Sequence, residues 1–105
     1  MDVVEFLSER IDEDEAAARK LLKDRSVSKS GRWYEERLLR ECQAKRTLIA
    51  VVEEARQAAL ASLVGQDPNA APWNPEAIEW TSRALNAIAL PYAEHPDYQP
   101  DWRLL

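Results

Sequence analysis

The stretch that decides the fold runs from Arg32 to Val64 and reads RWYEERLLRECQAKRTLIAVVEEARQAALASLV. It holds no proline and no glycine, and its apolar residues recur at spacings of three, four and seven, the pattern of a helix with one buried face. These residues are Leu38, Cys42, Ile49, Val52, Ala59 and Leu63. The pattern predicts one helix over residues 32–64, about 50 Å long at about 1.5 Å of rise per residue.

A shorter helix is predicted before it, over residues 2–25. Asp2 can cap its first turn, and Glu5 can complete a capping box. Asp14 falls on the apolar face of this helix and interrupts it. The other residues of that face are Val4, Leu7, Ile11, Ala18 and Leu21. The polar residues 26–31 have the length of a helix-hairpin connection, so the two helices are predicted to pack antiparallel.

A third helix is predicted over residues 75–90, where it would cover the part of the long helix that the shorter one leaves open. Asn74 can cap it, Pro75 suits its first position, and Pro91 ends it. The tail, residues 91–105, is rich in proline and aromatic residues and is predicted to pack back as a structural lock. The lock residues are Pro91, Tyr92, His95, Asp97, Tyr98 and Trp102. The predicted fold is therefore one all-α domain of 105 residues: a long helical hairpin, a third helix and a packed tail.

Charge is banded along the chain, which has a formal net charge of −5. Acidic residues dominate positions 1–18, and basic residues dominate positions 19–48. The basic band could meet nucleic-acid phosphates, or it could pair with the acids at 12–15 inside the hairpin or in an antiparallel dimer. The bases of the long helix are Arg32, Arg37, Arg40, Lys45 and Arg46. Because the whole chain is acidic, we favour pairing and keep nucleic-acid binding as the alternative.

The chain offers few residues for a zinc site or for nucleophilic catalysis. The chain has one cysteine and one histidine, Cys42 and His95, and zinc needs about four ligands. Cys42 is predicted to be a small core residue, and His95 to hydrogen-bond Asp97 or the backbone. We therefore predict no metal, no cofactor, no catalytic residue and no enzymatic activity.

Two pairs of carboxylates keep one enzymatic alternative open. Glu9 and Asp12, and likewise Glu76 and Glu79, are spaced to share a helix face. Magnesium-dependent hydrolysis of nucleotides can be run with carboxylates alone, so a hydrolase of this kind is the third alternative.

Aromatic residues are frequent in a chain whose helices are filled with alanine. They can clamp the helices together, or some can serve as exposed anchors for a protein partner. The predicted partner-binding residues are Trp33, Tyr34, Trp73, Arg37, Arg40, Lys45 and Arg46.

The chain lacks an apolar run long enough to cross a membrane, and its first residues are acidic where a signal peptide is basic. These features, with the single cysteine, predict a soluble cytoplasmic protein.

Two stretches carry a family resemblance: LLRECQAKR at 38–46 and ALPYAEHPDY at 89–98, followed by Trp102. Together with the start of the chain, they resemble a family of small uncharacterised proteins of actinobacteria and their phages. Members often carry a longer insert between the first helix and the Ala-Lys-Arg helix, where this chain has a short serine-rich connection. The resemblance implies an actinobacterial or phage origin and no mechanism. Together with the residues, it predicts a self-associating accessory module that binds a host protein.

Overall fold

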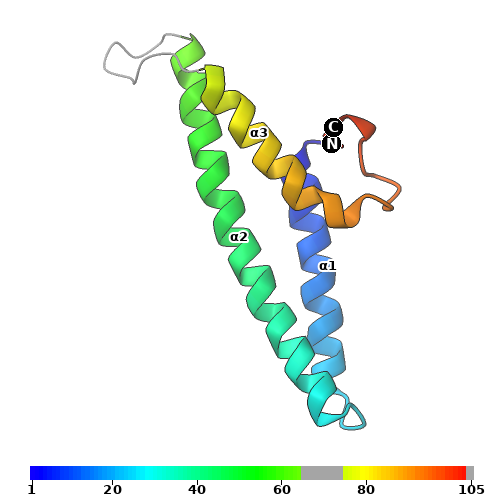
Figure 1. The fold of residues 1–105 in the computed structure, drawn as a ribbon. Helices are drawn as coiled ribbons and strands as arrows, with labels where there is room; N and C mark the ends of the chain where they lie inside the picture. The colour runs from blue at the N-terminus through cyan, green and yellow to red at the C-terminus, as the bar shows by residue number, and fades with distance from the viewer. Residues whose placement is uncertain (65–74, 104–105) are drawn as a thin grey trace.

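The computed structural model describes residues 1–64 and 75–103, and all of its regular elements are helices. Its elements are α1 (Val3–Lys23), α2 (Lys29–Val64), α3 (Pro75–Ala89) and the 3-10 helices η1 (Leu90–Tyr92) and η2 (Pro100–Trp102) (Figure 1). No strand occurs among the described residues. The predicted all-α fold is confirmed.

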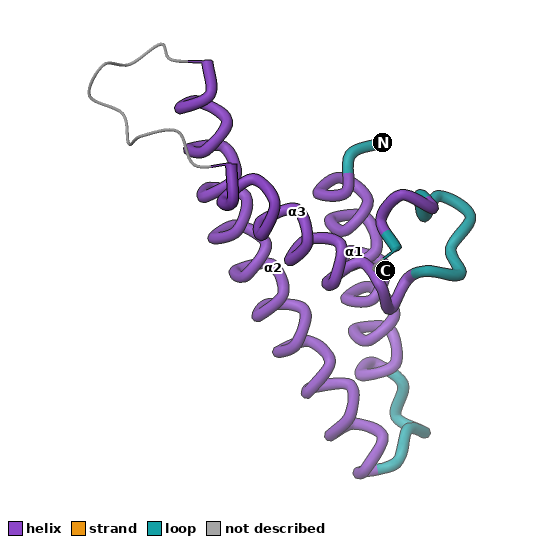
Figure 2. Tube along the Cα trace, turned by 45° about the horizontal axis from the view of Figure 1, so that its top comes forward, coloured by secondary structure: helices purple, strands orange, loops and turns teal. Residues whose placement is uncertain are grey.

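α1 and α2 form an open hairpin, and α3 lies across it. α1 and α2 run antiparallel from their connection and separate toward the other end of α2 (Figure 1). α3 starts beside the C-terminal end of α2 and reaches α1 with its own C-terminal end, and the tail continues beside α1 (Figure 2). α3 thereby covers the part of α2 that α1 leaves open, as predicted.

The connection between the first two helices is shorter than predicted. α1 ends at Lys23 rather than Arg25, because Asp24 adopts an extended backbone and its carboxylate accepts the backbone N–H of Ser26 at 2.9 Å and its hydroxyl at 2.7 Å. These two bonds hold the pKa of Asp24 below its ordinary value. α2 begins at Lys29, three residues before the predicted start.

Ser28 explains the early start of α2. Its hydroxyl accepts the backbone N–H of Gly31 at 3.1 Å, which satisfies one of the free donors of the first turn. Gly31 lies inside this turn, where a Cβ atom would come within 2.9 Å of Cγ1 of Val27. The glycine that the sequence analysis placed in the connection is thus needed for close approach of Val27.

The start of α1 differs from the predicted capping box. Asp2 occupies the cap position, but its side chain makes no capping hydrogen bond. Its carboxylate lies instead 3.6 Å from the Arg56 guanidinium of α2. The first residues of the chain are therefore joined to α2 by an ion pair.

α3 begins at Pro75 as predicted and ends at Ala89, one residue before the predicted end. The tail has more regular structure than its proline content suggested, because Pro91 is the second residue of η1 and Pro100 is the first residue of η2. Gly65, Trp73 and Asn74 lie outside the described residues.

The core lies where the three helices and the tail meet. It contains Val3, Phe6, Leu7, Ile11, Cys42, Ile49, Val52, Leu85, Ala89 and Tyr98. Cys42 is a core residue as predicted, and burial raises the pKa of its thiol. The predicted faces of the first two helices are buried near the core, whereas their outer members Leu21 and Leu63 are exposed. No helix among the described residues is long and apolar enough to cross a membrane.

Candidate interaction surface

The tail is fixed to α1 by an aromatic cluster centred on Phe6. Phe6 is fully buried, and its ring lies within 6.2 Å, centroid to centroid, of every other ring of the cluster. Those rings belong to Tyr92, His95, Tyr98 and Trp102. Pro91 is exposed and is the middle residue of η1. The tail rings were predicted to pack back onto the helices, whereas the role of Phe6 was not predicted.

A buried arginine completes the attachment of the tail. Nη1 of Arg10 donates to Nδ1 of His95 at 3.0 Å, and the backbone N–H of Asp97 donates to the same nitrogen at 3.0 Å. Nδ1 must therefore carry no proton in this arrangement. Nη2 of Arg10 lies 2.9 Å from the Glu13 carboxylate, which balances the buried charge. His95 thus bonds the backbone at Asp97, as predicted, and also Arg10, which was not predicted.

Asp14, which interrupts the apolar face of α1, has a partner in the tail. The hydroxyl of Tyr92 donates to its carboxylate at 2.7 Å, and the Lys45 ammonium donates to the Tyr92 oxygen at 3.3 Å. Burial, and secondarily the bond to Asp14, raises the pKa of Tyr92 well above its ordinary value. Lys45 therefore belongs to an internal contact between α1, α2 and the tail.

The acidic band of α1 and the basic band of α2 meet inside the hairpin. The Arg46 guanidinium donates to Asp12 and, at 3.0 Å, to Glu15. The bond from Arg46 holds the pKa of Glu15 below its ordinary value, and these partners raise the pKa of Arg46. The predicted pairing within the hairpin is therefore present for Arg46.

Most other bases of the predicted band also have internal partners. Arg32 donates to the carbonyl of Leu22 at 2.9 Å, and Arg37 lies 3.0 Å from the Glu41 carboxylate. Arg40 is exposed and has no ion pair within the described part of the chain. This leaves less free positive charge for phosphate than the sequence suggested.

The predicted aromatic anchors Trp33 and Tyr34 are exposed in the first turns of α2. Their rings contact each other at 5.0 Å, and the Arg37 guanidinium lies 5.7 Å from the Trp33 ring centre. Trp80 of α3 is also exposed. Trp33 and Trp80 therefore do not hold the helices together. The aromatic residues that do so are Phe6 and the rings of the tail.

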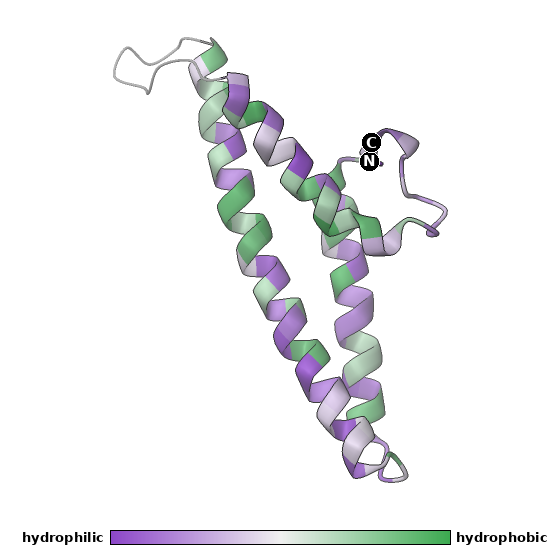
Figure 3. Cartoon of the chain, viewed as in Figure 1, coloured by the Kyte–Doolittle hydropathy of each residue, from purple (hydrophilic) through white to green (hydrophobic). Residues whose placement is uncertain are grey.

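The middle of α2 presents an apolar stripe, which we call the outer stripe: the exposed residues Ala44, Leu48 and Val51 and the half-buried Ala55. Leu48 is 50% exposed and Val51 is 59% exposed, although both lie at the centre of a 36-residue helix. Figure 3 shows hydrophobic segments recurring along this part of α2. Single exposed apolar residues are ordinary on a surface, but a row at helical spacing is typical of a contact face. This row was not predicted, because the apolar pattern of the buried face of α2 is the stronger of the two.

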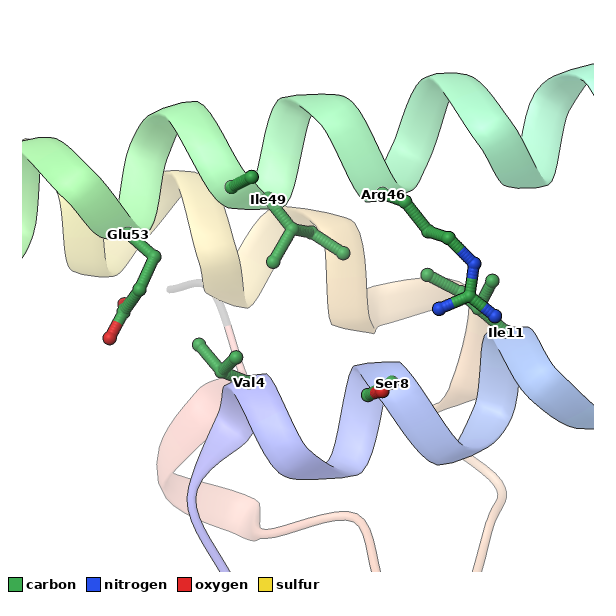
Figure 4. Close-up of a pocket in the computed structure, with 7 residues that line it drawn as sticks. Val4, Ser8, Ile11, Arg46, Ile49 and Glu53 are labelled. Carbon is green, nitrogen blue, oxygen red and sulfur yellow. The ribbon is translucent and has the colours of Figure 1, made fainter.

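A groove lies between α1 and α2. Val4, Ser8 and Ile11 face Ile49 across a groove of about 310 Å³ (Figure 4). Arg46 and Glu53 stand at its two ends, and Arg46 is already held by the acids of α1. The groove is a widening of the hairpin interior.

The two predicted carboxylate pairs are not assembled into a common site. Glu9 lies 3.4 Å from the Arg10 guanidinium, while Asp12 bonds Arg46. Glu76 and Glu79 are exposed on α3. In residues 1–64 and 75–103, no group of three or more histidine, cysteine or acidic side chains is placed to hold a metal ion.

Comparison with known proteins gives one match. The model of a family of unknown function (DUF6221) matches residues 1–104, nearly the whole chain. Neither the curated proteins nor the solved structures contain a match. The predicted resemblance to an uncharacterised family is confirmed at this coarse level.

Proposed function

The chain belongs to the DUF6221 family of unknown function, and from this premise we propose that it is a non-enzymatic helical module that binds another protein. The outer stripe of α2 is the observation that carries the proposal. Exposed Leu48 and Val51 offer apolar area at mid-helix, and Arg40 lies beside them with no internal ion pair among the described residues. Protein interfaces have an apolar centre and are enriched in arginine.

We place this module in the cytoplasm of an actinobacterium or of a cell infected by its phage, where its partner would be a host protein. The C-terminal motif at 90–98 supports this origin. Nucleic-acid binding through the basic band is less favoured, because Arg32, Lys45 and Arg46 have internal partners.

Site-specific photo-cross-linking tests the proposal. A benzophenone amino acid at Leu48 is expected to capture protein in living cells, while the same amino acid at Leu21 of α1 is not. Leu21 is the matched control, since it is also an exposed leucine in a helix, at 43%. Equal capture at both positions, or none at Leu48, would contradict the proposal. Adducts that disappear after nuclease treatment would favour the nucleic-acid alternative.

A further inference from the structure

The outer stripe has the same spacing when α2 is read in either direction. Its residues follow one another at intervals of four, three and four: Ala44, Leu48, Val51 and Ala55. Alternating intervals of three and four define the seam along which two helices interlock. A stripe with this symmetry can pair with itself when the second helix is antiparallel.

We propose that a second copy of this chain docks on the outer stripe, with the two α2 helices antiparallel about a two-fold axis between Leu48 and Val51. Leu48 then lies opposite Val51 of the second copy, and Ala44 lies opposite Ala55. The central layers bury the exposed aliphatic side chains, and the alanine layers let the two helices approach closely. The inference rests on the proposed function, because it concerns the same surface, and it names a second copy rather than a host protein as the occupant of that surface.

Charge beside the stripe favours this orientation. At about 3.6 residues per turn, Arg40 and Glu54 lie on the same flank of the stripe. Both are exposed, and neither has an ion pair within the described residues. The antiparallel arrangement brings Arg40 of each copy to Glu54 of the other, so the pair forms twice.

A parallel arrangement is disfavoured by the same flanks. It would set Arg40 against Lys45 of the second copy, because flanking residues of parallel helices meet at an offset of five. Like charges held together at a contact weaken it. The proposed dimer does not need the acidic and basic bands to exchange partners, and it leaves Arg46 bound to Asp12 and Glu15 within each chain.

The mass of the protein in solution is the first test. Light scattering on the full chain is expected to give twice the 12.0 kDa of one chain. The double variant Leu48→Glu/Val51→Glu is expected to give the mass of one chain with unchanged helical circular dichroism. Leu21→Glu on α1 is the matched control and should remain a dimer. A wild-type monomer at high concentration, or a dimer that survives the double variant, overturns the proposal.

Charge exchange tests the flanking pair. Arg40→Glu is expected to raise the dissociation constant of the dimer about tenfold, because two attractions become repulsions. Glu54→Arg should do the same, and the combined variant should restore wild-type affinity. Additive weakening in the combined variant overturns the proposed register.

Spin-label distances test the orientation. Thr47 and Glu36 are exposed on α2, and each can be replaced by cysteine and labelled while Cys42 stays buried. The antiparallel dimer predicts about 40 Å between labels at Glu36, from about 1.5 Å of rise per residue. Labels at Thr47 should be separated by less than half of that distance. Short distances at both positions would indicate parallel helices and overturn the proposal.

Failure of the dimer can be distinguished from failure of the proposed function. A monomer that still cross-links another protein through Leu48 overturns the dimer and leaves the interaction module standing. A monomer that cross-links nothing through Leu48 overturns both.

Discussion

Phe6 joins the two ends of the chain through ring contacts alone. Its ring is fully buried and contacts four rings of the tail, with Trp102 at 5.0 Å. Arg10, one turn further along α1, adds polar bonds to the same tail at His95. The two side chains show that the tail is held by packing at one level of α1 and by hydrogen bonds at the next.

Phe6→Ala is therefore expected to lower the free energy of unfolding by about 3–5 kcal/mol, the usual cost of emptying a buried aromatic site. Urea denaturation followed by circular dichroism measures it. Trp33→Ala is the control, because Trp33 is exposed and its loss should cost about 0.5 kcal/mol or less. Equal costs for the two variants would show that the cluster does not stabilise the fold.

The loss of folding stability caused by Tyr92→Phe should depend on pH. At pH 7 the variant loses the hydrogen bond to Asp14 and is expected to be about 1 kcal/mol less stable. Because the fold raises the pKa of Tyr92, this hydroxyl stabilises the protein fully below the unfolded value of about 10 and progressively less above it. The difference between wild type and variant should therefore shrink above about pH 10. Urea midpoints at pH 7, 9 and 11 measure this, and a constant difference would contradict it.

At the scale of elements, the two ends of the α1–α2 connection are built by short side chains. Asp24 ends α1 by binding Ser26, and Ser28 begins α2 by binding Gly31. Asp2 is a residue type that often caps helices, but its carboxylate forms an ion pair with Arg56 instead. Residue type alone therefore does not identify the caps of this protein.

Ser28→Ala is expected to destabilise the protein by about 0.5–2 kcal/mol, because a free backbone donor of α2 loses its partner. Asp2→Ala loses only a partly exposed ion pair and should cost less. Thermal denaturation of the two variants side by side checks the order. A larger loss for Asp2→Ala would contradict the capping geometry.

Gly31→Ala should gain less than the usual advantage of alanine over glycine in a helix, about 1 kcal/mol, because its Cβ would press on Val27 at 2.9 Å. In a Val27→Ala background that contact is gone, and the same change should recover most of the gain. A double-mutant cycle measures the coupling. No coupling would show that the two residues do not compete for space.

The helices were predictable because their signals are local. α2 has no interior proline, an uninterrupted helical period and a length that fixes its type, and Pro75 marks the start of α3. The start of α2 at Lys29 was not predicted, because glycine usually ends a helix. Here Gly31 lies inside the helix, where its lack of a side chain leaves room for Val27. Element boundaries depend on such single contacts.

The contacts between elements were only partly predictable. Asp14 was visible as an acid on an apolar face, but its partner Tyr92 lies near the other end of the chain. Arg10 carried a similar signal, since it lies three residues after Leu7 and four before Asp14 on that face. Arg10 is buried because the tail packs against it. The spacing of residues within α1 does not reveal this contact.

At the scale of the whole molecule, the tail is part of the core. Removing residues 91–105 exposes Phe6 and takes away His95, the tail partner of Arg10, and Tyr92, the tail partner of Asp14. The shortened chain is expected to unfold at a lower temperature, with a broader transition and increased binding of a hydrophobic dye. Adding a peptide of residues 91–105 should reverse these changes. A shortened chain as stable as the full one would contradict this role of the tail.

The meeting of Phe6 with Trp102 also sets an order of events at the ribosome. Nearly the whole chain separates the two rings, so α1 emerges first, and Phe6 has no tail ring to pack against until Trp102 has been translated. At about 5–20 residues per second, that wait lasts roughly 5 to 20 s. Nascent chains stalled before the tail should therefore be substrates for chaperones, and a slow codon in the stretch that encodes residues 91–102 should lower the yield of folded protein more than one in the stretch that encodes α1.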